Sequence, residues 1–161
     1  MDYLWAPWRV TYIEQPKAEG CILCEKPKAD RDEDNLILFR GAHNFVILNL
    51  YPYNPGHLMV APYRHIASPT LLTDAESAEH FRLVARCTEW LTEVMKPHGF
   101  NVGMNLGRVA GAGIDDHIHS HVVPRWDGDC NFMPVLADTK VVSESIEATY
   151  KKLKRNLASK R

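Results

Sequence analysis

The sequence predicts one compact domain that combines a meander of β-strands with two helices. Two observations carry this prediction: short apolar runs of strand length occupy residues 36–61 and 100–123, and two longer segments change to the three- and four-residue spacing of an amphipathic helix. With 161 residues, 45% of them hydrophobic, the chain can bury one sizeable core. We expect an arm over 1–20, a core over 21–135 and a C-terminal helical segment over 136–161.

The first half of the chain predicts a charged loop followed by three strands. Residues 21–35 hold a CxxC pair and then a dense run of charged side chains, which is typical of a solvated loop. The apolar runs 36–40, 45–50 and 57–61 come next, and they are separated by Gly41, by the turn 51–56 and by Pro62. We therefore expect neighbouring strands here.

The second half predicts a helix, two strands and a last helix. Thr73 and Glu76 form a capping-box pair at a helix start, and Pro97 ends that helix. Strands are expected over 100–106 and 117–123, and a helix from about Ser143. The apolar stripes of the two helices comprise Phe81, Val84, Cys87, Leu91 and Val94, and Ile146, Tyr150, Leu153 and Leu157.

Composition excludes several classes of protein from first consideration. The formal net charge is −1, so no basic field is available to hold a nucleic acid polymer or an anionic membrane. The chain has neither a run of about 18 apolar residues nor a signal-peptide pattern at its start. Cys21 and Cys24 form the CxxC pair while Cys87 and Cys130 are isolated, which differs from a secreted disulfide framework. We expect a cytoplasmic protein.

Three histidines alternate along the predicted strand 117–123. Because side chains two residues apart share one face of a strand, His117, His119 and His121 point the same way, while Ile118 and Val122 point into the core. Three interpretations stay open: a chance surface cluster, a metal site, and a nucleophilic imidazole flanked by histidines that orient it and bind an anion. Ser120 is the one polar residue on the inner face.

The segment before these histidines favours the nucleophilic interpretation. Residues 105–113 contain Gly107, Gly111 and Gly113, and such a flexible loop can bring backbone N–H groups close to phosphate oxygens. A glycine-rich loop alone is a weak signal. Directly before a row of histidines, it indicates phosphoryl or nucleotidyl transfer.

The histidine pattern resembles the histidine-triad motif of the HIT superfamily of nucleotide hydrolases and transferases. The similar segments are 117–123, the ribose-binding strand and turn 48–57, and two stretches, 111–113 and 124–134, that resemble the bacterial and archaeal branch with diadenosine tetraphosphate phosphorylases. The resemblance implies an α+β fold with a five-stranded antiparallel sheet and two main helices. It also implies a homodimer and a nucleotide lying across the sheet.

The resemblance assigns a role to each matching residue. His119 would be the nucleophile that forms a nucleotidyl intermediate, and His121 would hold the α-phosphate. Asn49 would bind the ribose, and Trp126 would either stack on adenine or simply pack. The remaining positions implied for the nucleotide and phosphate site are His57, Asn105, Ala112 and Gly113.

Two departures from the family pattern bear on the reaction. Gly113 stands where many hydrolases of the superfamily carry Gln, and Ser120 stands where they carry an apolar residue. Without a Gln side chain the site has room for free phosphate, so we favour phosphorolysis of a dinucleoside polyphosphate over its hydrolysis. The alternatives are an AMP phosphoramidate hydrolase, a nucleotide-binding regulatory module without turnover, and a metal-handling protein.

The CxxC pair by itself leaves a redox pair and half of a zinc site open. The resemblance implies a structural zinc on Cys21, Cys24, His65 and His117, with no organic cofactor. His43, His80 and His98 have no matching role and are expected on the surface. The arm with Trp5, Pro7, Trp8 and Arg9 would pack either across a dimer partner or within its own subunit.

Overall fold

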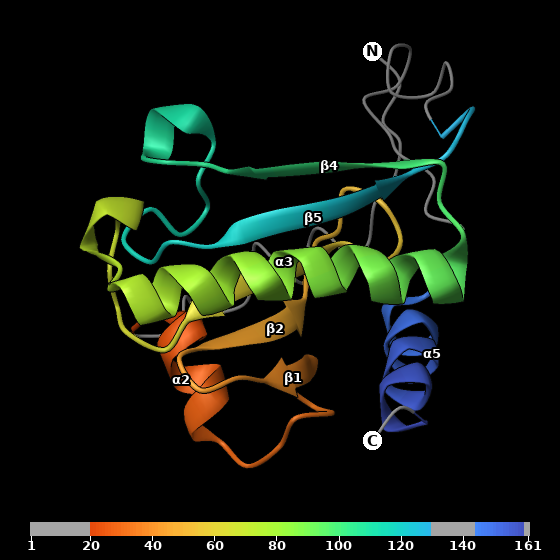
Figure 1. Cartoon of the computed structure of the whole chain (residues 1–161), viewed down its shortest axis with the longest axis horizontal. Coiled ribbons are helices and arrows are strands. Elements are labelled where there is room, and N and C mark those ends of the chain that lie inside the picture. Colours follow the sequence, from red (N-terminus) through yellow and green to blue (C-terminus); the bar gives the residue numbers. More distant parts are fainter. Residues whose placement is uncertain (1–19, 130–143, 160–161) are drawn as a thin grey trace, which may run out of the picture.

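The computed structural model describes residues 20–129 and 144–159 and contains a five-stranded antiparallel sheet (Figure 1). The strand order is β1-β2-β3-β5-β4, which confirms the predicted fold class. The strands are β1 (Ile37–Arg40), β2 (Asn44–Leu48), β3 (Leu58–Pro62), β4 (Gly99–Met104) and β5 (Ser120–Arg125).

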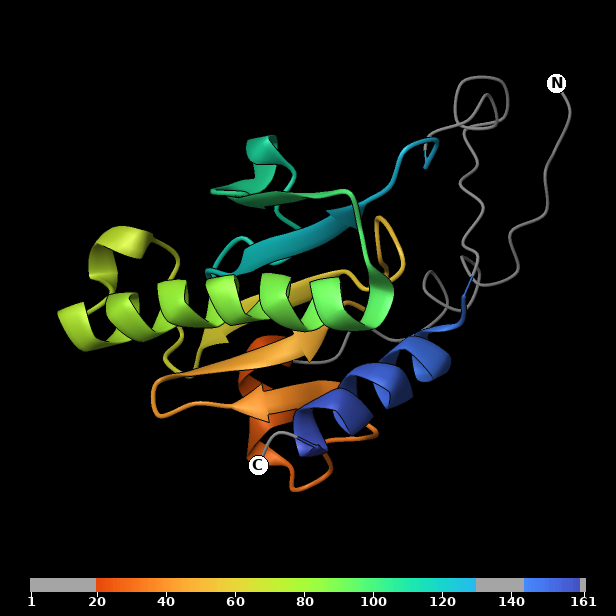
Figure 2. The ribbon, with the colours of Figure 1, turned by 45° about the vertical axis from the view of Figure 1, so that its right-hand side comes forward.

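Two main helices cover one face of the sheet. The long helix α3 (Asp74–Met95) lies along it, and α5 (Ile146–Ala158) packs against α3 and β1 (Figure 2). A shared hydrophobic core joins these helices to the inward side chains of β2, β3 and β5. The opposite face carries a second, smaller core around Phe45 and Leu23.

The expected loop 21–35 is wrong in its first part, because residues Ile22–Lys28 form a helix, α2. This helix buries Leu23 against the second face of the sheet. It is seven residues long, contains Pro27, and its first residue is preceded by Cys21 without a side-chain cap. Such a helix has no apolar periodicity, so nothing in the pattern predicted it.

The start of α3 is as predicted, but its buried stripe is shifted. Thr73 and Glu76 form both hydrogen bonds of a capping box. Phe81, expected in the core, is 75% exposed, whereas His80, expected on the surface, is only 4% exposed. The prediction for His80 is therefore wrong, while His43 and His98 are exposed as expected. The buried residues of the helix are Glu76, His80, Leu83, Val84, Cys87, Trp90 and Leu91.

The histidine strand begins three residues later than predicted. β5 starts at Ser120, so His117 and His119 precede the sheet ladder. The segment before it is held differently, because the Ile118 N–H donates to the Ile66 carbonyl at 2.7 Å. Ile118 and Val122 are nevertheless buried, as the alternation predicted.

Parts of the predicted organisation lie outside the described residues. These are nearly all of the arm 1–20 and the whole of residues 130–143, which include Cys130, so the division into arm, core and C-terminal segment stays a prediction. The helices that the structure does describe include none with the length and apolar character needed to cross a membrane.

Glu76 generates a prediction about stability and pH. Its carboxylate accepts from Arg64 Nε at 2.6 Å and Nη2 at 2.7 Å and from the Thr73 N–H at 2.7 Å. The Arg64 guanidinium, and then the Thr73 backbone, lower the pKa of Glu76 to about 2. We expect Glu76→Gln to lower the melting temperature at pH 7, since Gln keeps the capping geometry but not the charge.

Because the pKa of Glu76 is depressed in the folded state, its contribution is present above the ordinary value of 4.5 and is lost as pH falls towards 2. Melting curves at pH 7, 4 and 2.5 should show the melting temperatures of the parent protein and of Glu76→Gln converging as the pH falls. Glu89→Gln, at an exposed site of the same helix, is the matched control. A difference that stays constant with pH would contradict this explanation.

Candidate active site and metal centre

The histidines lie on the sheet face opposite α3. Along β5, Val122 belongs to the core under α3, whereas His121 points to the other face beside Met59 of β3. The ring centroids of His119 and His121 are 4.8 Å apart, and those of His121 and His57 are 5.0 Å apart. Three of the residues singled out in the sequence therefore form one cluster.

His57 has its protonation state fixed by its neighbours. Its Nδ1 accepts from the Tyr53 N–H at 3.1 Å and lies 3.2 Å from Asn49 Nδ2. The proton must then be on Nε2, which lies 2.9 Å from Nδ1 of His121. Burial, followed by repulsion from His121 and His119, lowers the pKa of His57 to about 3. His57 is thus a neutral donor at neutral pH.

His121 is a neutral imidazole with a donor left over. Its Nδ1 accepts from His57, so Nε2 carries the proton. Burial and then His119 lower the pKa of His121 to about 4. This Nε2 is buried and has no hydrogen-bond partner within the described structure. A buried N–H without a partner is suited to an incoming oxygen atom.

His119 presents a lone pair beside that donor. Its Nδ1 lies 2.8 Å from the His117 carbonyl oxygen, which can only accept, so Nδ1 carries the proton. The lone pair is then on Nε2, the atom free to attack. The side chain is 6% exposed and packs edge-on against His121. A lone pair available for attack and a hydrogen-bond donor are therefore neighbours.

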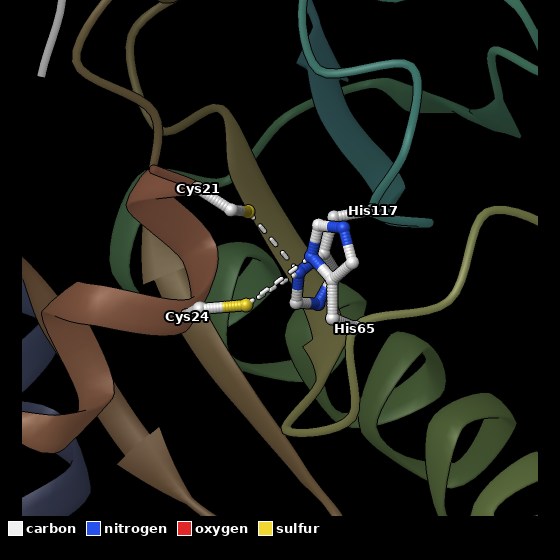
Figure 3. Close-up of side chains that lie close together, drawn as sticks. All are labelled: Cys21, Cys24, His65 and His117. Atoms are coloured by element: carbon white, nitrogen blue, oxygen red, sulfur yellow. Dashed lines mark hydrogen bonds between the residues drawn. The ribbon is translucent and has the colours of Figure 1, made fainter. Parts of the chain in front are cut away.

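Cys21, Cys24, His65 and His117 form a compact group of metal-ligating atoms (Figure 3). Their ligand atoms all lie within 4.8 Å of one another. Cys21 Sγ is 3.3 Å from His117 Nδ1, and Cys24 Sγ is 3.3 Å from His65 Nδ1 and 3.4 Å from His117 Nδ1. Zinc bond lengths of about 2.3 Å to sulfur and about 2.0 Å to nitrogen give a tetrahedral edge of about 3.5 Å. The donor set therefore fits a metal ion.

Both histidines of this group have their second nitrogen occupied. His117 Nε2 lies 2.9 Å from the Pro62 carbonyl oxygen, and His65 Nε2 lies 3.4 Å from a carboxylate oxygen of Asp116. Each contact leaves Nδ1 as the ligating atom, which is the usual outer-shell arrangement of a metal-bound histidine. Burial, and then Cys21, raise the pKa of the Cys24 thiol to about 11, so this thiol is protonated at neutral pH without a metal.

The glycine-rich loop is ordered by contacts among its own residues. Asn105 Nδ2 donates to the Gly111 carbonyl at 3.5 Å, and the Ala112 N–H donates to the Gly107 carbonyl at 3.4 Å. The Ala112 amide is therefore already engaged. Gly113 is exposed, and a Cβ atom built there meets no heavy atom within 4 Å. The loop has space at the position where the family pattern has Gln.

Trp126 and Asn49 differ in how they relate to the cluster. Trp126 follows the last residue of β5, and its N–H donates at 3.2 Å to Asp129 Oδ2, which also accepts from Asn54 Nδ2 at 2.8 Å. Asn49 contacts the cluster directly: its Oδ1 accepts from the Tyr51 N–H at 2.9 Å and its Nδ2 faces His57.

The sequence did not single out Tyr53, whose ring lies 4.8 Å from His57 and 5.9 Å from His121 between centroids. Only its place in the turn 51–56 could have drawn attention to it. His80 was also missed as a functional candidate, although its spacing to Val84, Cys87 and Leu91 equals that of a buried stripe.

A cavity of about 380 Å³ lies away from this site, between β1 and α3. None of the histidines lines it.

Comparison with known proteins identifies the family. Residues 30–128 match the HIT domain family, which covers more than half of the chain. The chain belongs to the HIT family.

This HIT protein is similar to proteins of known and unknown activity. It is 41% identical over 158 residues to "AP-4-A phosphorylase" of Mycobacterium tuberculosis, covering 92% of this chain and 80% of that protein. It is 29% identical over 93 residues to the asymmetrical bis(5'-nucleosyl)-tetraphosphatase of Schizosaccharomyces pombe, covering 58% of this chain and 50% of that one. A solved Zn-bound histidine triad family protein from Mycobacterium smegmatis is 24% identical with a TM-score of 0.68, covering 87% of this chain and 94% of that chain.

Proposed function

We propose that this HIT protein is an enzyme that cleaves dinucleoside polyphosphates such as diadenosine tetraphosphate. The reaction would proceed through a nucleotidyl intermediate on His119. The observation that carries the proposal is the pairing of the His119 Nε2 lone pair with the buried His121 Nε2–H. The 41% identity to a protein named for diadenosine tetraphosphate phosphorolysis, over 92% of the chain, supports the substrate class.

The reaction consists of two in-line displacements at one phosphorus atom. The His119 Nε2 lone pair attacks the α-phosphorus, a P–N bond forms, and the P–O bond to the remaining polyphosphate breaks. His121 Nε2–H donates to an oxygen on which negative charge accumulates, and His57 holds His121 in the required tautomer. An acceptor oxygen then attacks the same phosphorus, and the P–N bond breaks.

The other sequence candidates have positioning roles in this proposal. Asn49 and the turn before His57 would hold the ribose, and Asn105 with the Gly113 backbone would hold phosphate oxygens. Ala112 would contribute by shaping the loop, because its N–H already donates to Gly107. Trp126 would contact the nucleotide only at the distal end of an extended ligand.

We propose inorganic phosphate as the preferred acceptor. Phosphate and water compete for the same intermediate, so the outcome depends on whether the site holds phosphate in line with the P–N bond. The open space at Gly113 supports this preference, since a Gln side chain there would fill it. Phosphorolysis releases ADP and a shortened nucleotide, whereas hydrolysis releases AMP.

We propose a structural zinc ion at the Cys21, Cys24, His65 and His117 group. The two thiols and two imidazoles support zinc, as do the contacts of the second histidine nitrogens with the Pro62 carbonyl and the Asp116 carboxylate. Four protein ligands would complete a tetrahedron without an open position for water. Reduced thiols are required for this site, which agrees with a cytoplasmic location.

We propose that a second copy of the chain pairs along β4. In the described sheet β4 ends the strand order, so one of its edges has no partner strand there. Val102 of β4 is 51% exposed, and Val109 in the turn Arg108–Ala110 after the strand is fully exposed. Light scattering should give about twice the chain mass of 18.3 kDa, and Val102→Lys should give monomers. A monomeric parent protein would contradict the proposal.

The nucleophile is tested by His119→Asn. This variant should still bind nucleotide but lose turnover by about a thousandfold or more, because no P–N bond can form. Mass spectrometry of the parent protein, given diadenosine tetraphosphate without phosphate, should detect an adduct on His119. His43→Asn, at an exposed histidine, is the matched control. Turnover close to the parent value in His119→Asn would refute covalent catalysis by this residue.

The zinc site is tested by metal analysis. Purified protein should contain about one zinc per chain. Cys21→Ser should lose the metal and lower the melting temperature, because the ion holds α2 to the sheet. Cys87→Ala should also lower the melting temperature, since Cys87 is fully buried, yet keep the metal. Protein made with adequate zinc but containing none would remove this proposal and leave the catalytic one intact.

The choice of acceptor is tested by Gly113→Gln. The backbone there is not in the left-handed region and the surroundings are open, so the substitution is tolerated sterically. We expect the ratio of ADP to AMP at fixed phosphate concentration to move towards AMP. Gly113→Ala, which adds no amide, should keep the parent ratio. If Gln leaves the ratio unchanged, the acceptor is selected elsewhere.

A further inference from the structure

A buried histidine on α3 takes no part in the reaction described above. His80 is 4% exposed, and both of its ring nitrogens are bonded. Nε2 lies 2.7 Å from Ser120 Oγ, and Nδ1 lies 2.9 Å from Asn44 Oδ1. The residue is on the helix side of the sheet, so the sheet itself separates it from the histidine cluster.

The direction of each hydrogen bond in this network is set by groups that can only accept. Asn44 Nδ2 lies 3.1 Å from the Glu76 carbonyl and 3.0 Å from Glu79 Oε2, so its Oδ1 faces His80 and accepts from Nδ1–H. Nε2 of His80 therefore accepts the hydroxyl hydrogen of Ser120. Burial lowers the pKa of His80 to about 4, so the ring stays in this neutral form at neutral pH.

The far end of the network is rigid. The Glu79 carboxylate accepts from three successive backbone N–H groups, those of Ala42, His43 and Asn44, at 2.7 to 2.8 Å. This fixes the start of β2 to α3. On one side His80 is thus bonded to Asn44, whose own amide group is bonded to Glu76 and Glu79. On the other side it is bonded to a single hydroxyl, that of Ser120.

Ser120 stands at a critical position of the active-site strand. It is the first residue of β5, it lies between His119 and His121 in the chain, and it is paired with Val60 and Met104 in the ladder. The residues before it lie outside the ladder, where the bond from the Ile118 N–H to the Ile66 carbonyl holds the backbone. The directional bond from Ser120 to His80 adds a side-chain constraint at this end of the strand.

We propose that His80 is a positioning residue, which acts through Ser120 to fix the orientation in which the imidazoles of His119 and His121 converge on one phosphorus atom. This inference rests on the proposed function. An apolar side chain at position 120 would fill the space but would not fix a direction. The departure of Ser120 from the family pattern therefore has a physical role here.

The test compares His80→Leu and Ser120→Ala with Leu83→Ala. Leu83 is a buried core residue one turn along the same helix; its truncation should destabilise the protein while leaving the bond between His80 and Ser120 in place. We expect the first two variants to lower kcat by about tenfold to a hundredfold with little change in KM. Leu83→Ala, assayed well below its melting temperature, should keep the parent kcat. His80→Gln, which retains an acceptor for the hydroxyl, should recover part of the loss.

A second measurement does not depend on turnover. In nitrogen-15 spectra of the ligand-free protein, Ser120→Ala should shift the ring resonances of His119 and His121 towards mixed tautomers, while Leu83→Ala should leave them unchanged. Equal losses of kcat in His80→Leu and Leu83→Ala at matched stability, or unshifted ring resonances in Ser120→Ala, would overturn the proposal. Shifted resonances in a protein that cleaves no dinucleoside polyphosphate would uphold the positioning role and overturn the proposed function.

Discussion

The alternation of side chains along β5 is the constraint on which the rest of the site depends. Ser120 and Val122 face α3, whereas His121 faces the open side of the sheet. Pairing with both β3 and β4 sets this register. A slip by one residue would bury His121 under the helix and expose Val122. His121 is therefore held in place by the same hydrogen bonds that hold the sheet together, whereas His119 precedes the ladder.

His117 connects the candidate metal group to His119, the proposed nucleophile. Its ring reaches the cysteines through Nδ1, and its backbone carbonyl accepts the proton of His119 Nδ1. This one residue thus contacts both cysteines at the start of α2 and sets the tautomer of His119. The cluster is best regarded as one continuous structure that extends from Cys21 to His57, rather than as two separate sites.

Local periodicity and matching motifs were sufficient to predict part of the fold and of the site. The strand runs, the Thr73 capping box and the members of the metal group are examples. The choice between His80 and Phe81 as the buried residue could not be predicted, since both fit a helical stripe and the decision depends on Ser120, 40 residues away. The start of β5 depends likewise on a tertiary bond, from Ile118 to Ile66. The tautomers of His57 and His121 could not be predicted either, because they depend on the tertiary position of the Tyr53 N–H, which donates to His57 Nδ1.

The neutral state of His57 and His121 has a consequence for product departure. Both imidazoles are uncharged at neutral pH, because their pKa values are depressed to about 3 and about 4, and in the proposed reaction His121 would meet the polyphosphate as a neutral donor. Lysine or arginine at these positions would bind the anionic substrate more strongly, but would strengthen the binding of the anionic products by a similar amount. An uncharged donor instead gives most of its benefit while charge builds up during bond breaking. In the proposed reaction such a site would accelerate the chemical step while binding the released nucleotides only weakly.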